Sequence, residues 1–286
     1  MFILGTGVFV LVTLLLLYTL FIRNPRRSLN DVRSQAGLRW LLYGGLILPI
    51  VILAIVFVFT LRSMQVLAHD DDPPLTIEVV GHMWWWEVRY PDYNIITANE
   101  IYIPTGQVVE LHLTSADVIH SFWVPELHGK MDLVPGTTRA FQIQADQART
   151  YRGICAEFCG LQHAKMHFLV VAEPPEAFDA WLQHQQTTAR TMLSESAQRG
   201  REVFFEVGCQ FCHAIGGTDA VSRFGPDLTH FASRQTIGAA SLPNNRGNLG
   251  GWVVNAQTIK PGSRMPPVEI PAEDVEPLLD FLESLD

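Results

Sequence analysis

The sequence predicts a multidomain protein made of a two-helix transmembrane hairpin, an all-β domain of the sandwich or Greek-key type, and an all-α C-terminal domain. Three observations support this fold class. Two uncharged apolar runs stand near the N-terminus, short runs of alternating polarity follow them, and helical patterns return in the last third of the chain. At 286 residues the chain is long enough for two or three compact units.

The two apolar runs cover residues 2–22 and 40–60, and neither contains a charged side chain. A helix of this length, at about 1.5 Å per residue, spans the roughly 30 Å hydrocarbon core of a bilayer. The first run lacks the basic leader and the small-residue cleavage site of a secretory signal, so we interpret it as a retained helix. Residues 1–62 are therefore predicted to form a transmembrane hairpin.

The segment between the two runs predicts the topology. It contains Asp31 as its one acidic residue and five arginines, Arg23, Arg26, Arg27, Arg33 and Arg39. Short basic loops stay in the cytoplasm. Both termini and everything after residue 62 are therefore predicted on the outer, periplasmic face of a bacterial-type inner (plasma) membrane.

The exported part of the chain is acidic. Residues 62–286 contain 15 basic and 28 acidic side chains. This balance argues against nucleic acid as a partner. It would attract a basic protein partner, or it serves only to keep the exported part soluble.

Residues 74–173 are predicted to form the all-β domain. Apolar and polar side chains alternate in residues 107–115 and 139–146, which predicts strands with one buried face. The predicted inward-facing side chains are Val109, Leu111, Leu113, Phe141 and Ile143. A helical pattern follows within residues 174–194, which we interpret as a helix and a linker.

The motif CQFCH at residues 209–213 is the attachment signature of a c-type haem. Its cysteines, Cys209 and Cys212, are predicted to form thioethers, and His213 is predicted to ligate the iron. Met265 is the one methionine downstream of His213 and is the predicted second axial ligand. A zinc site would need a second cysteine pair, and the other two cysteines stand in the β domain. Residues 195–286 are therefore predicted to form a haem c domain that transfers electrons.

This C-terminal segment also resembles class I cytochrome c. The resemblance rests on GPDL at residues 225–228, after the haem motif, and on Trp252 before the loop with Met265. It implies an all-α domain in which the Pro226 carbonyl accepts the ring proton of His213 and fixes the imidazole.

The segment ICAEFCGLQHAKM, residues 154–166, contains the other two cysteines, Cys155 and Cys159, together with His163 and Met166. A disulfide would leave the histidine and the methionine unexplained, and a zinc site would seldom include a thioether. Thiolate, imidazole and thioether are donors that copper prefers. His120, at the end of the strand-like stretch ADVIH, is the candidate for one more ligand.

Three motifs resemble the dinuclear copper A domain of cytochrome c oxidase subunit II: HSFWVP at 120–125, KMDLVPG at 130–136, and the segment that contains the two cysteines. The two preceding helices and the haem c domain are similar to the caa3-type branch of that family. The resemblance implies a Greek-key, cupredoxin-like domain with this ligand set: Cys155 and Cys159 as bridges between both coppers, His120 and Met166 on one copper, and His163 and the backbone carbonyl of Glu157 on the other.

The same resemblance implies two further roles. The Glu157 carboxylate would reach a magnesium ion at the boundary with subunit I. In GHMWWWEVRYPD, residues 81–92, Trp84 would be the point at which electrons from a cytochrome c enter. The family commonly has tyrosine where Trp85 stands here, and we interpret Trp85 and Trp86 as packing residues.

The function implied by the resemblance is electron transfer in a haem-copper terminal oxidase. A cytochrome c or a quinol-oxidising complex would supply electrons to haem c, and copper A would pass them to the oxygen-reducing, proton-pumping subunit I. The apolar runs contain no Asp, Glu, Lys, Arg or His for a proton path. The alternative is the copper A subunit of a nitric oxide reductase. A copper-delivery protein would have no need of Met166 or of a second redox domain.

Overall fold

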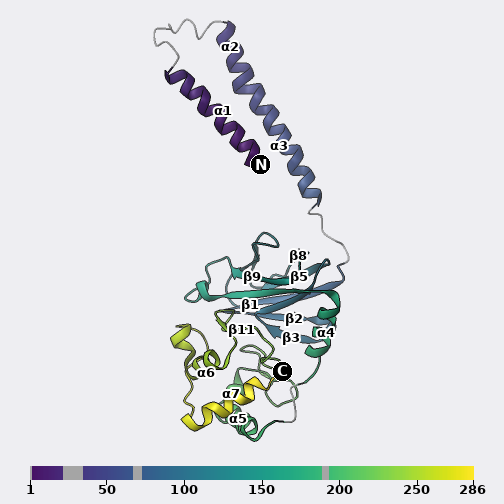
Figure 1. Ribbon diagram of the computed structural model, residues 1–286, viewed down its shortest axis with the longest axis vertical. Helices are drawn as coiled ribbons and strands as arrows, with labels where there is room; N and C mark the ends of the chain where they lie inside the picture. The colour runs from purple at the N-terminus through teal and green to yellow at the C-terminus, as the bar shows by residue number, and fades with distance from the viewer. Residues whose placement is uncertain (1, 22–34, 67–72, 189–192) are drawn as a thin grey trace. The chain divides into compact units, whose positions relative to one another are not determined.

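The computed structural model describes residues 2–21, 35–66, 73–188 and 193–286, and the chain forms two compact units, Met1–His69 and Asp70–Asp286 (Figure 1). The helices of the first unit are α1 (Phe2–Phe21), α2 (Gln35–Leu42), the π-helical turn η2 (Tyr43–Ile47) and α3 (Leu48–Val66). The predicted limits 40–60 are too narrow, because helix continues from Gln35 to Val66. An uncharged run marks the apolar part of a helix, whereas polar residues at either end also adopt helical structure.

Most apolar side chains of the described residues of the first unit are exposed. The stretch Gly37–Ser63 is long and apolar enough to cross a membrane, and Gly5–Phe21 is a shorter apolar stretch. Arg23, Arg26, Arg27 and Arg33, on which the predicted topology depends, lie outside the described residues, whereas Arg39 lies in α2.

The irregular turn η2 has a local cause. It precedes Pro49, which has no backbone N–H and so donates no hydrogen bond to the turn before it.

The second unit begins with a β-sandwich of two five-stranded sheets. The first sheet has the order β3-β2-β1-β5-β8 and contains β1 (Leu75–His82), β2 (Trp85–Tyr90), β3 (Ile95–Ala98), β5 (Val108–Ser115) and β8 (Arg139–Gln144). The second has the order β4-β10-β9-β6-β7 and contains β4 (Glu100–Pro104), β6 (His120–Trp123), β7 (Met131–Leu133), β9 (Arg149–Cys155) and β10 (His167–Glu173). The predicted all-β domain is confirmed.

The core of the sandwich lies between the sheets and follows the predicted alternation. In β5 every second residue is buried, with Val109, Leu111 and Leu113 facing inward. Phe141 and Ile143 on β8 are also buried. The largest core side chains are aromatic: Trp86, Tyr90, Phe122 and Phe168.

The helix predicted within residues 174–194 is α4 (Pro175–Gln185), and it packs on the sandwich. Its buried side chains, Phe178 and Leu182, belong to the same core as the strands. Trp181 stacks on Tyr102 of β4, with ring centres 4.5 Å apart. The helix therefore closes one side of the β domain.

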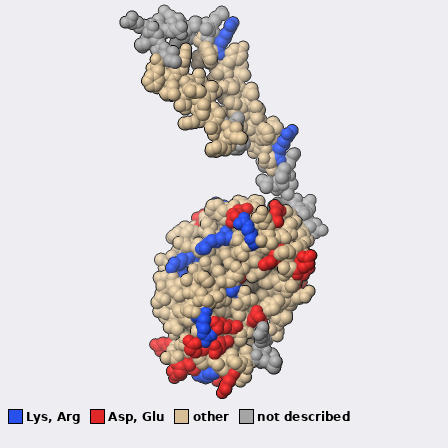
Figure 2. All heavy atoms as spheres, viewed as in Figure 1, with Lys and Arg blue, Asp and Glu red and all other residues tan. Residues whose placement is uncertain are grey.

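The C-terminal part is helical, as predicted. Its elements are α5 (Glu195–Glu206), the turn η5 (Cys209–Phe211), the two-residue strands β11 (Thr236–Ile237) and β12 (Leu242–Pro243), α6 (Arg246–Ile259) and α7 (Ala272–Glu283). Asp and Glu side chains gather over the end of the unit that holds α5 and α7 (Figure 2). Arginines pair with several of them there, including Arg199 with Asp274 and Arg246 with Asp280.

Helices α5 and α7 cross at Gly200. A Cβ atom at this position would overlap the carbonyl oxygen of Pro277 and lie 2.8 Å from the Cβ of Phe281. Because glycine has no Cβ, the two helices approach closely here. The crossing supports the core of the C-terminal part.

Replacing Gly200 with alanine is therefore expected to destabilise the C-terminal part. Overpacking of this kind costs about 1–3 kcal/mol, which lowers the unfolding midpoint of a small domain by about 5 °C or more. Gly251→Ala on α6 is the control, because a Cβ atom there would lie 3.9 Å from the Ile259 Cδ1, which is ordinary van der Waals contact. Thermal unfolding followed by haem absorbance should separate the two variants, and equal midpoints would contradict the close crossing.

Candidate metal centre and haem cavity

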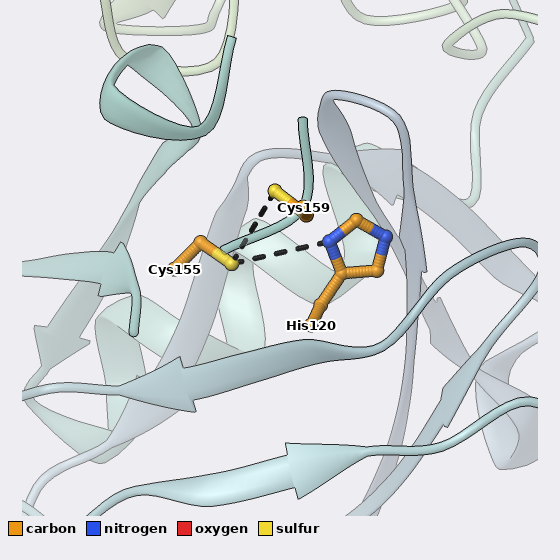
Figure 3. A group of neighbouring side chains, drawn as sticks. All are labelled: His120, Cys155 and Cys159. Carbon is orange, nitrogen blue, oxygen red and sulfur yellow. Dashed lines mark hydrogen bonds between the residues drawn. The ribbon is translucent and has the colours of Figure 1, made fainter. Parts of the chain in front are cut away.

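The two cysteines of residues 154–166 lie beside His120 (Figure 3). Cys155 ends β9 and His120 begins β6, and these strands are hydrogen-bonded neighbours. The Cys155 Sγ lies 3.8 Å from the Cys159 Sγ and 3.9 Å from the His120 Nδ1. All three side chains are buried, and their donor atoms lie within 4.8 Å of one another. In the described part of the chain, this is the one group of His, Cys, Asp or Glu gathered tightly enough to hold a metal.

The other predicted donors lie around the same two sulfur atoms. The His163 Nδ1 and the Met166 Sδ are each 3.7 Å from the Cys159 Sγ. The backbone carbonyl oxygen of Glu157 is 3.2 Å from the Cys155 Sγ. The structure thus brings all six predicted donor atoms together.

The donor set fits copper. The cysteines are free, and a sulfur separation of 3.8 Å is far longer than the ~2.05 Å of a disulfide. Two thiols, a thioether, two imidazole nitrogens and a carbonyl oxygen offer the soft and borderline ligands that copper prefers. Burial of Cys155, Cys159, His120 and Met166 shields the sulfur atoms from water.

Hydrogen bonds within the group change its ionisation. The hydrogen bond with Cys159 lowers the pKa of Cys155, while burial opposes this and His120 assists it. The same pairing and burial raise the pKa of Cys159. The site therefore favours one thiolate, which is the form of cysteine that binds metal ions.

Asp117 orients the His120 ring, a role that was not predicted from the sequence. The His120 Nε2–H donates to the Asp117 Oδ1 at 2.9 Å, which leaves Nδ1 directed at the thiols. Burial opposes the change, but the hydrogen bonds from His120 and from the Met83 and Val118 N–H groups lower the pKa of Asp117. A carboxylate three residues before a candidate histidine ligand was the available signal.

Trp84 lies against the thiol loop, in the turn between β1 and β2. Its Nε1–H donates to the Cys159 carbonyl at 2.8 Å, and its side chain is buried. Gly160 has a φ of +110°, and a Cβ atom there would lie 3.0 Å from the Trp84 ring. Trp84 is therefore in direct contact with the loop that carries the two thiols.

The neighbouring tryptophans pack elsewhere. Trp86 is fully buried in the sandwich core, with its ring centre 5.0 Å from that of Phe168. Trp85 stacks on His82, with ring centres 4.4 Å apart. Trp86 therefore has the packing role expected from the sequence, whereas Trp85 packs on His82 and also lines a cavity of the C-terminal part.

The C-terminal part contains a cavity with about 1250 Å³ of empty space, part of it open to solvent. Cys209, Cys212, His213 and Met265 all line it. The His213 Nδ1–H donates to the Pro226 carbonyl at 2.7 Å, so Nε2 is the nitrogen left for a metal. Two cysteines, a histidine and a methionine around one apolar cavity fit a covalent haem with two axial ligands.

The β domain forms part of the wall of this cavity, a contact that no local pattern in the sequence indicates. Met83, Trp84 and Trp85 line it together with the residues of the haem motif. Lys260, itself buried, donates from Nζ to the Trp84 carbonyl at 2.7 Å and to the Gly238 carbonyl at 3.1 Å. The haem cavity and the thiol site therefore meet at Trp84.

A β-sandwich with a buried dithiol site, joined to a cytochrome-like domain, defines a class of two-centre electron-transfer proteins. Residues 94–173 match the family described as "Cytochrome C oxidase subunit II, periplasmic domain", and residues 197–286 match the family described as "Cytochrome c". The chain belongs to the cytochrome c oxidase subunit II family.

Curated relatives support this assignment over most of the chain. A protein of Alkalihalophilus pseudofirmus named cytochrome c oxidase subunit 2 is 37% identical over 246 residues, which cover 84% of this chain and 71% of the relative. A protein of the same name from Bacillus sp. PS3 is 33% identical and covers 84% of this chain and 72% of its own length.

One solved structure is similar to part of the chain. The crystal structure of the periplasmic domain of subunit II of cytochrome oxidase from Bradyrhizobium japonicum matches with 27% identity and a TM-score of 0.39. The match covers 40% of this chain and 95% of that one.

Proposed function

We propose that this chain is the electron-transfer subunit of a haem-copper terminal oxidase. It accepts electrons from a donor at haem c, passes them through dinuclear copper A and delivers them to the oxygen-reducing, proton-pumping subunit I. This proposal depends most on one observation: in a chain of this family, four donor atoms lie around two free, buried thiols. The haem cavity beside Trp84 supports the order of the two centres.

The proposed ligands divide between the two centres. At the thiol site, Cys155 and Cys159 would hold copper A together with His120, Met166, His163 and the backbone carbonyl of Glu157. At haem c, Cys209 and Cys212 form the thioethers, and His213 and Met265 are axial. Dinuclear copper held by these side chains would supply a one-electron carrier for the transfer step.

The residues around the centres have positioning roles in this proposal. Pro226 holds the His213 ring through the hydrogen bond to Nδ1. The Trp84 ring donates a hydrogen bond to the Cys159 carbonyl. This ring is the proposed point at which electrons enter the copper site. Burial keeps water from the thiols and limits side reactions.

We also propose a membrane topology, domain boundaries and partners for this chain. Residues 1–62 form a transmembrane hairpin, with both termini and the redox domains on the periplasmic face of the plasma membrane. Residues 74–173 form a Greek-key copper A domain, 174–194 a helix and linker, and 195–286 the cytochrome c domain. Subunit I is the acceptor partner, a cytochrome c or a quinol-oxidising complex is the donor, and the Glu157 carboxylate binds magnesium at the boundary with subunit I.

Oxygen is the better-supported terminal acceptor. The curated relatives described above are named cytochrome c oxidase subunit 2, which favours an oxidase over the nitric oxide reductase alternative. Assay of the intact membrane complex with each gas would compare the two acceptors directly.

The proposal is tested by the metal content and the spectra of the full chain purified in detergent. We expect two coppers for each covalent haem, and a paramagnetic copper signal with hyperfine splitting from two equivalent nuclei. A single copper or a zinc ion in the thiol site would contradict the dinuclear assignment. Haem released by denaturation in organic solvent would contradict the thioether assignment.

A further inference from the structure

The loop that carries Met265 lies directly on the loop that carries the copper ligands. The Gln162 side-chain amide, next to His163, donates to the Pro261 carbonyl. The Lys165 Nζ, next to Met166, donates to the Ile259 carbonyl at 2.5 Å. Residues 259–265 and 155–166, which we call the haem loop and the copper loop, therefore touch through residues adjacent to the proposed ligands.

A charged pair extends this contact to His120. The Arg264 Nη2 lies 3.5 Å from the Asp117 Oδ2, and Arg264 immediately precedes Met265. The same carboxylate accepts from the His120 Nε2–H through Oδ1 and from the Met83 N–H through Oδ2 at 2.8 Å. Its side chain is 13% exposed, so the pair with Arg264 is formed by a carboxylate that is largely shielded from water.

The charge on Asp117 acts on the ring that faces the thiols. A carboxylate that accepts a hydrogen bond from a metal-bound imidazole makes the imidazole a stronger electron donor and fixes its orientation. A stronger donor favours the oxidised metal centre. A cation beside the carboxylate weakens this effect, since it draws charge away from the hydrogen bond.

We propose that Asp117 and Arg264 link the two redox centres: Asp117 positions His120, and Arg264, supplied by the haem loop, raises the reduction potential of the copper centre when the cytochrome domain is docked. This inference rests on the proposed function. It assigns Arg264 a role in tuning the electron acceptor, in addition to any role in holding the domains together.

If the pair of Arg264 and Asp117 only held the domains together, its removal would have a different effect. Arg264 is 45% exposed, and exposed ion pairs contribute little to stability, about 0–1 kcal/mol. A pair with only that role would leave the copper potential unchanged when it is removed. The reduction potential therefore separates the two roles.

The test compares Arg264→Gln, Arg264→Lys and Arg246→Gln in the full chain loaded with copper and haem. Arg246 is the control because it lies in the same domain, is exposed to a similar degree, and pairs with Glu276 and Asp280 on α7. For Arg264→Gln we expect the copper potential to fall, with a change of about threefold in the one-electron equilibrium constant, or about 28 mV. We expect Arg264→Lys to stay within half of that shift, and Arg246→Gln to leave the potential unchanged.

A second readout tests the route through Asp117. In paramagnetic NMR spectra of the copper-loaded protein, Arg264→Gln is expected to shift the His120 ring N–H resonance and to leave the His163 ring resonances in place. Equal shifts of both rings would show a general field effect of Arg264 and would overturn the proposed link.

The outcomes also separate this inference from the proposed function. A wild-type chain without dinuclear copper would refute the proposed function. Wild-type protein with dinuclear copper, and Arg264→Gln with an unchanged copper potential, would refute the link alone.

Discussion

Cys155→Ser is expected to abolish copper binding at the thiol site while the covalent haem is retained. The Cys155 Sγ is within 3.9 Å of three other proposed donor atoms, on Cys159, His120 and Glu157. A serine hydroxyl remains protonated near neutral pH and is a poor ligand for copper, which prefers thiolates. Copper and haem contents of the purified chain measure the effect, from two coppers for each haem to none.

Glu157→Gln provides the matched control for this loss. The atom of Glu157 that faces Cys155 is the backbone carbonyl oxygen, which the substitution retains. We therefore expect Glu157→Gln to bind two coppers. If Cys155→Ser retained both coppers, or if Glu157→Gln lost them, the assignment of the ligands in this loop would be wrong.

Met265→Ala is expected to leave haem attached and to lower its reduction potential by on the order of 0.1 V or more, because a thioether axial ligand raises the potential of haem iron. The thioether bonds to Cys209 and Cys212 do not depend on Met265, so the haem should remain covalent. Spectroelectrochemical titration of the haem bands measures the change.

Met83→Leu is the control for Met265, since Met83 lines the same cavity from the copper domain. Its hydrogen bond to Asp117 uses the backbone N–H and survives the substitution. We expect Met83→Leu to change the haem potential little. A large fall in Met83→Leu, with none in Met265→Ala, would make Met83 the axial ligand.

Local patterns predicted much of the fold. The period-2 alternation of β5 marks Val109, Leu111 and Leu113 as inward-facing, and these side chains are buried. The uncharged runs predict where the N-terminal helices lie, but the second helical segment is longer than its run. A charged side chain ends an uncharged run, whereas the backbone hydrogen bonds of a helix continue past it. The packing of α4 on the sandwich depends on Phe178 and Leu182, whose partners are distant in the sequence.

The candidate site was predictable where its residues are close in the sequence or carry an uncommon side chain. Cys155, Cys159, His163 and Met166 lie within twelve positions, and the structure brings His120 to them. The contacts of Lys260 with Trp84 and of Arg264 with Asp117 were not predictable, because they join residues more than 140 positions apart. An arginine or lysine in a loop has no local feature that indicates its partner.

Met83, Trp84 and Trp85 line the haem cavity, so the β domain and the cytochrome domain are in contact. This contact bears on the rate of electron transfer between them. Because both domains belong to one chain, their encounter is governed by an effective concentration set by the linker and not by the amount of protein in solution. Dilution then leaves the step between the domains unaffected. Ionic strength acts chiefly on the first encounter with an external donor, where exposed charges are screened over about 10 Å at 0.1 M salt.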